Sequence, residues 1–113
     1  MQYRPSPAEI VELFERVAPR GPDVTRRKMF GYPAAFVNGN LCCGTFADRL
    51  MLRLGDGDRA ELEALGGTPF EPMPGRPMRG YVAIDPHLIV DETDLRAWCE
   101  RSAAFTRRLP PKG

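Results

Sequence analysis

The pattern of apolar and polar residues predicts helices at both ends of the chain and short strands between them. Near the start, apolar residues recur at the spacing of one helix face: Ile10, Leu13, Phe14 and Val17. Ser6 suits the N-cap and Pro7 suits the first helical position, since proline has no N–H to leave unpaired there. We therefore expect an amphipathic helix over about residues 7–18.

Between residues 24 and 54 the pattern changes to short runs of β-branched and aromatic residues separated by turn residues. These runs cover residues 24–30, 34–37, 41–46 and 50–54. Asn38-Gly39 is the strongest turn signal, because both residues tolerate the positive φ of a type I′ hairpin. In the last run, Met51 and Arg53 alternate with a leucine face made of Leu50, Leu52 and Leu54. We expect an antiparallel meander with one core face and one face at least partly in contact with solvent.

The second half of the chain predicts a short helix, an ordered turn region, one more strand and a closing helix. The expected ranges are 58–65, 68–80, 81–84 and 91–109 in that order. Asp58 is a capping residue for the short helix, and the acidic first turn and basic last turn of the closing helix complement the helix dipole. The predicted fold class is therefore α+β, with the C-terminal helix packed on one face of the sheet.

Composition favours one small domain that spans residues 1–113. The 113 residues include 16 basic and 15 acidic side chains, and a net charge of +1 gives no field that would draw the chain to polyanions. No signal peptide and no membrane span are expected, so we predict a cytoplasmic protein. An odd count of three cysteines also suits a reducing compartment.

One basic cluster is a candidate anion-binding or partner-binding site. It would form if the triplet Arg26, Arg27 and Lys28 met Arg76 and Arg79 of the turn region. The alternative is a solvated strand and a solvated loop that do not meet. This cluster carries the nucleic-acid hypothesis, although no aromatic residues are interleaved with it as in single-strand binders.

The sequence Phe30-Gly31-Tyr32 is a second candidate, as a loop that contacts a ligand. Glycine allows a ligand to approach closely, but Gly31 is equally typical of a bulge or bend, with Phe30 packed in the core. We favour the structural interpretation.

The reactive residue types do not combine into a recognisable catalytic site. Cys42 and Cys43 are expected on opposite faces of a strand, one in the core and one half-buried, and the single histidine, His87, lies far away in sequence. The acidic cluster before residue 95 is what the dipole of a helix start favours. We expect no metal site, no cofactor and no enzymatic activity, with a thiol-based enzyme or redox sensor at Cys42 or Cys43 as an alternative.

The order of short motifs along the chain resembles the N-terminal domain of the TfoX/Sxy competence regulators. These motifs are Arg27-Lys28-Met29-Phe30-Gly31, Val37-Asn38-Gly39, Asp48 to Leu52, Gly67-Thr68-Pro69-Phe70, Gly75, Met78, Gly80-Tyr81, and Leu95 with Trp98. The resemblance covers nearly the whole chain and implies the same α+β fold without established catalytic residues. Full-length members act in transcription of DNA-uptake genes and carry a C-terminal domain, so this chain is expected to be a stand-alone version.

From these observations we expect a noncatalytic binding or regulatory module, linked through the resemblance to transcription regulation. Its partners would be proteins, with a homodimer as one form of such contact. Direct nucleic-acid binding through the basic cluster is the first alternative, and thiol chemistry is the second.

Overall fold

The computed structural model describes residues 4–112 and contains helices at both ends of a sheet-forming segment. The helices are α1 (Ala8–Val17), α2 (Asp56–Ala64), the 3-10 helix η1 (Pro86–Leu88) and α3 (Glu92–Arg107). The strands are β1 (Val24–Met29), β2 (Tyr32–Val37), β3 (Asn40–Phe46), β4 (Arg49–Arg53), β5 (Thr68–Pro69) and β6 (Tyr81–Ile84). The short strand β5 lies where the sequence predicted only an ordered turn region.

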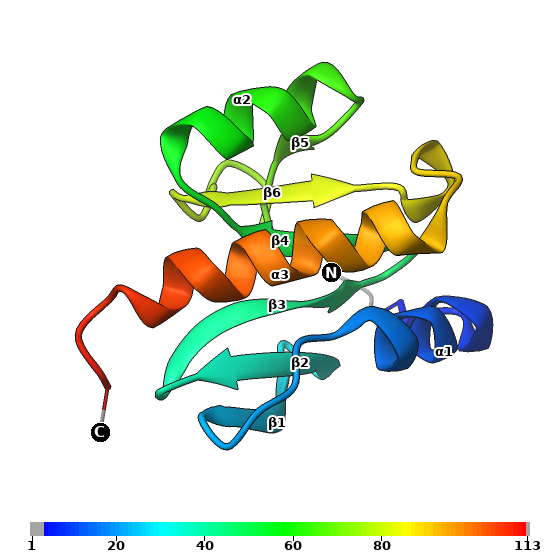
Figure 1. The fold of residues 1–113 in the computed structure, drawn as a ribbon. Helices are drawn as coiled ribbons and strands as arrows, with labels where there is room; N and C mark the ends of the chain where they lie inside the picture. Colours follow the sequence, from blue (N-terminus) through cyan, green and yellow to red (C-terminus); the bar gives the residue numbers. More distant parts are fainter. Residues whose placement is uncertain (1–3, 113) are drawn as a thin grey trace.

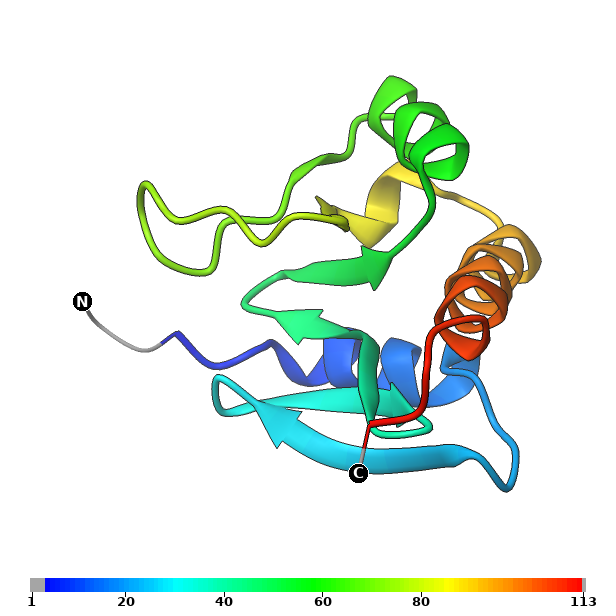
Figure 2. The same ribbon diagram turned by 90° about the vertical axis from the view of Figure 1, so that its left-hand side faces the viewer.

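The described strands form one open antiparallel sheet in the order β1-β2-β3-β4-β6-β5. Helix α3 crosses the sheet on the face that α1 also covers (Figure 1). The view turned by 90° shows α3 on one side of the sheet and the loop between β5 and β6 on the other (Figure 2). The predicted α+β class and the packing of the C-terminal helix on one sheet face are confirmed.

Two-residue turns connect the first four strands. Asn38 and Gly39 have φ of 50° and 83°, so the predicted type I′ hairpin is confirmed. The preceding turn uses Phe30 and Gly31, whose φ values are 56° and 84°. These turns give the neighbouring strands the tight antiparallel register that defines which side chains share a face.

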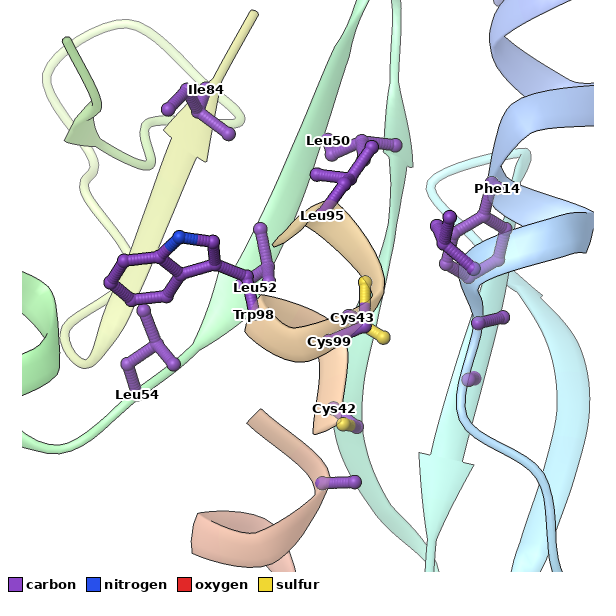
Figure 3. Packing of buried hydrophobic residues seen from close by; sticks show 14 of the residues in the cluster. Phe14, Cys42, Cys43, Leu50, Leu52, Leu54, Ile84, Leu95, Trp98 and Cys99 are labelled. Carbon is purple, nitrogen blue, oxygen red and sulfur yellow. The ribbon is translucent and has the colours of Figure 1, made fainter. Parts of the chain in front are cut away.

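The main core lies between the helices and the first face of the sheet, which we call the helix face. Leucines at alternate positions of β4 and just beyond it point to this face, as predicted from the period of two. Figure 3 shows these leucines packed against Trp98 and Leu95 of α3, with Phe14 of α1 beside them. Trp98 is buried with 6% exposure, so its prediction as a core residue is confirmed.

The second face of the sheet, which we call the open face, is more apolar than expected. It carries its own buried cluster, made of Ala34, Phe36, Leu41, Met51, Phe70, Tyr81 and Ala83. Phe70 comes from the segment that follows β5, and its ring packs edge-on against Phe46 with centroids 5.1 Å apart. The turn region folds back and supplies side chains that cover part of this face, while Thr25 and Arg27 stay exposed on it. The expectation of a face at least partly in contact with solvent is therefore confirmed.

A bulge in β3 changes the expected placement of the vicinal cysteines. Ala35 pairs with Cys43 but Phe36 pairs with Leu41, so Cys42 is an extra residue between them. Alternation fails at this point, and Cys42 and Cys43 both enter the core on the helix face, with 0% and 1% exposure. The prediction of opposite faces, with one half-buried thiol, was wrong.

The helix starts differ from the sequence predictions in their capping residues. Ser6 does not cap α1, because its hydroxyl donates to Thr45 Oγ1 at 2.8 Å and so ties the N-terminal segment to β3. Helix α2 begins at Asp56, which places Asp58 inside the first turn. At α3 the cap is Asp91, whose carboxylate accepts the Thr93 N–H at 2.8 Å.

Candidate functional site

The basic triplet of β1 is divided between the two faces of the sheet. Arg26 lies over the Phe14 ring of α1 at 4.8 Å and donates to Glu15 at 3.1 Å, so its charge is neutralised on the helix face. Arg27 lies on the open face, with its guanidinium carbon 4.2 Å from the centre of the Phe36 ring. Neighbouring residues of a strand point to opposite faces, so these two arginines cannot serve one ligand together.

The other members of the predicted basic cluster lie in exposed positions. Lys28 is exposed in the edge strand β1, and Arg76 and Arg79 are exposed in the loop between β5 and β6. Arg76 belongs to a turn in which its N–H donates to the carbonyl of Met73 at 2.8 Å. No contact joins these three residues into one patch within the part of the chain that the structure describes.

The predicted loop contact proves to be a hairpin turn with an aromatic contact network. Phe30 is 43% exposed, and its ring packs edge-on against Phe46 at 6.1 Å and Phe70 at 6.4 Å. The favoured structural interpretation is therefore correct for Gly31, which lies in the bend with a φ of 84°, but wrong for Phe30, which is not packed in the core. Tyr32 is buried, and its hydroxyl donates to the carbonyl of Arg4.

Two residues absent from the predicted site complete a cationic region on the open face. Arg53 donates to the carbonyl of Leu41 at 3.3 Å and lies 5.2 Å from the centre of the Tyr81 ring. Lys112 lies beside Arg27, and the two help to line a hollow with Thr25, Phe36 and Gly39. The alternation of β4 already placed Arg53 on this face, whereas the docking of the C-terminal tail leaves no periodic signal.

The three thiols lie together in the core. Cys43 and Cys99 are side by side between β3 and α3, and Cys42 is farther along the strand (Figure 3). A hydrogen bond with Cys43 is the largest cause that lowers the pKa of Cys42 to about 7, and the hydroxyl of Ser102 adds to it from 3.3 Å. The same pair contact, together with burial, raises the pKa of Cys43.

The remaining polar candidates have structural contacts. The side chain of His87 is 71% exposed, and its Nδ1 lies 2.9 Å from Oδ1 of Asp85. The same carboxylate oxygen accepts the backbone N–H of His87. Glu92 pairs with Arg16 at 3.0 Å and with Arg96 at 3.3 Å. Among residues 4–112, no group of three potential ligands is placed to hold a metal ion, and no helix is long and apolar enough to cross a membrane.

Helices on one face of an open antiparallel sheet make this an α+β domain with a helix face and an open face. A family model for the TfoX N-terminal domain matches residues 15–106, and the chain belongs to this family. No curated protein and no solved structure matches the chain. Membership suggests a regulatory or competence-related role.

Proposed function

We propose that this domain is a noncatalytic regulatory module that acts through contacts with a partner protein, in a process of gene regulation. The observation that carries the proposal is the match to the TfoX N-terminal domain family over residues 15–106. The chemistry of the described side chains supports it. The thiols are buried in the core, and Asp91 and Glu92 stabilise the start of α3.

The open face supports a role in binding. Its buried aromatic cluster is bordered by arginines that lack a carboxylate partner among residues 4–112, namely Arg27 and Arg53. Arginine next to aromatic rings is typical of the residues that dominate protein interfaces. The helix face is occupied by α1 and α3, so the open face is the surface of the sheet that a partner can reach.

The experiment is affinity capture from the native lysate with the full chain as bait, followed by purification of each captured protein. We expect at least one captured protein to rebind the purified chain with saturation and a fixed stoichiometry. Light scattering of the chain alone separates a homodimer from a complex with another protein. Turnover of a small molecule, without any captured protein that rebinds, would contradict the proposal.

A further inference from the structure

A hollow of about 490 Å³ on the open face combines cationic side chains with an aromatic wall. It is lined by Thr25, Arg27, Phe36, Gly39 and Lys112. None of these residues is acidic, so the charge in the hollow is positive. Such a surface favours an anionic group.

Arg27 is placed to bind an oxyanion. Its guanidinium is stacked on the Phe36 ring at 4.2 Å, and no carboxylate of residues 4–112 pairs with it. Stacking fixes the plane of the guanidinium while its edge keeps N–H donors in the fork geometry that matches a carboxylate or phosphate. Arg26, the preceding residue, has its donors engaged by Glu15 on the helix face.

The C-terminal tail brings a second cation to the hollow. The Lys112 N–H donates to the carbonyl of Asn38 at 2.8 Å, and the Asn40 side chain donates to the carbonyl of Pro110 at 3.0 Å. These two bonds hold the tail against the hairpin between β2 and β3. Backbone contacts therefore hold Lys112 where it lines the same hollow as Arg27.

Arg53 adds a third cation on the same face, although it does not line the hollow itself. It donates to the carbonyl of Leu41, and Leu41 pairs with Phe36 across β2 and β3. Adjacent strands lie about 4.8 Å apart, so the contacts of Arg53 and Arg27 are on neighbouring strands of one face. We call Arg27, Arg53 and Lys112 the basic triad.

We propose that the basic triad binds carboxylate side chains of an acidic segment in a partner protein. This proposal rests on the proposed function and names the chemistry of the partner. Phe30 at the far end of β1 supplies an exposed apolar contact on the same face. Phe30 lies three positions after Arg27, in the turn that follows Met29, a span of at most about 10 Å. An extended peptide with glutamates or aspartates at one end and an apolar residue about three positions away matches this spacing.

A protein segment fits the face better than a nucleic-acid strand. Single-strand binders offer exposed aromatic rings on which bases stack. Here the rings beneath the arginines are buried, with exposures of 8% for Phe36 and 7% for Tyr81, so the exposed ring of Phe30 would have to stack a base without an exposed ring next to Arg27 or Arg53. The exposed members of the originally predicted cluster, Arg76 and Arg79, lie in a loop and do not line the hollow.

The test measures binding of a fluorescent glutamate-rich peptide that carries one leucine, with an oligothymidylate of equal length as the competing probe. We expect saturable peptide binding that weakens with salt and shifts the NMR signals of Thr25 and Gly39. Arg27→Gln should raise the Kd about tenfold, the loss expected for one interface arginine. Arg26→Gln is the matched control from the opposite face, and we expect its Kd to stay within about twofold, the near-neutral effect of a residue outside the contact.

Lys112→Gln provides a second variant, in the tail and outside the sheet, and it should also weaken binding of the peptide. Absence of peptide binding, equal losses for Arg26→Gln and Arg27→Gln, or tighter binding of the oligothymidylate would each overturn the proposal. A partner that is captured equally by the wild type and by Arg27→Gln would overturn the basic triad but leave the proposed function standing. Failure to capture any partner, with the peptide still bound at the triad, would instead contradict the proposed function.

Discussion

Phe70 and Phe30 show how one contact network contains side chains of very different burial. Both rings lie on the open face and contact Phe46, but Phe70 is 1% exposed and Phe30 is 43% exposed. The free energy of unfolding should depend on the buried ring far more than on the exposed one, because truncation leaves a cavity only where neighbours enclose the side chain.

We therefore expect Phe70→Ala to lower the free energy of unfolding by about 3–5 kcal/mol, as for other buried phenylalanines. Phe30→Ala, the matched control, should lower it by less than about 1.5 kcal/mol, since half of its surface is already in water. Urea unfolding followed by Trp98 fluorescence measures both values. Equal losses would show that the open-face cluster is not a second core.

Asp85 provides a prediction on pH at the scale of one residue. The backbone N–H of His87 is the largest cause that lowers the pKa of Asp85 below its usual value of 3.8, and the imidazole adds to it. A lowered carboxyl pKa stabilises the folded chain above the unfolded value, and that contribution is lost as the pH falls through the folded value. The relevant window therefore lies below pH 3.8.

His87→Ala removes the ring but keeps the backbone donor. We expect the carboxyl signal of Asp85 in a carbon-13 NMR titration to retain a midpoint below 3.8 in this variant. A midpoint that returned fully to the usual value would show that the imidazole, and not the backbone N–H, holds the pKa down.

At the scale of elements, two glycines without positive φ should respond in opposite directions to the same substitution. A Cβ at Gly44 in β3 would lie 2.7 Å from the carbonyl oxygen of Pro33 and 3.0 Å from Ala34, whereas a Cβ at Gly57 in α2 would meet no atom within 4 Å. The contacts at Gly44 are with the backbone of the paired strand, which cannot move without disturbing the ladder.

We expect Gly44→Ala to destabilise the domain by about 1–3 kcal/mol, the cost of overpacking. Gly57→Ala should stabilise it by about 0.5–1 kcal/mol, because alanine loses less backbone entropy in a helix. Thermal unfolding of the two variants measures both changes in stability. A stabilised Gly44→Ala would mean that β2 and β3 are not as closely packed as described.

The elements that follow a regular period could be predicted from the sequence, and those that depend on an irregularity could not. The alternation of leucines in β4 correctly predicted which side chains point to the core, and the Asn38-Gly39 pair correctly predicted a hairpin. The bulge at Cys42 could not be predicted, because an extra residue in a run of apolar residues leaves the apolar pattern unbroken. Ser6 had the chemistry of a cap, but tertiary contact with Thr45 took its hydroxyl.

The candidate site was predictable only in part for the same reason. Arg27 was named, but it was grouped with Arg26, although neighbouring residues of a strand point to opposite faces. The same period correctly placed Arg53 with Met51. Lys112 reaches the hollow through a tail whose docking depends on carbonyl contacts with Asn38 and Asn40. No sequence period encodes such a contact between a hairpin and a distant terminus.

At the scale of the whole molecule, the three thiols report on opening of the core. Cys42, Cys43 and Cys99 are all buried, although the pKa of Cys42 is lowered to about 7. Ionisation alone does not make a thiol reactive when a reagent cannot reach it. The alternative of a thiol enzyme or redox sensor needs an accessible sulfur.

We expect a thiol reagent such as Ellman's reagent to label all three cysteines slowly and at one common rate in the native protein at pH 8. The rate should rise with denaturant as the population of the opened state rises. A control in guanidinium, with the chain unfolded, should show three fast reactions. Rapid labelling of one cysteine in the native protein would contradict this picture and favour the thiol alternative.

The bulge in β3 has a consequence for insertions and deletions in the gene. Two consecutive carbonyls there accept hydrogen bonds on opposite faces of the sheet. On the open face, the carbonyl of Leu41 accepts the Tyr81 hydroxyl at 3.0 Å and the Arg53 guanidinium. In the core, the carbonyl of Cys42 accepts the Ser102 hydroxyl at 3.2 Å. Loss of the single codon for Cys42 would restore regular alternation and leave Ser102 of α3 without its acceptor. An in-frame change of one residue at this position would therefore affect the helix packing and the basic triad at once.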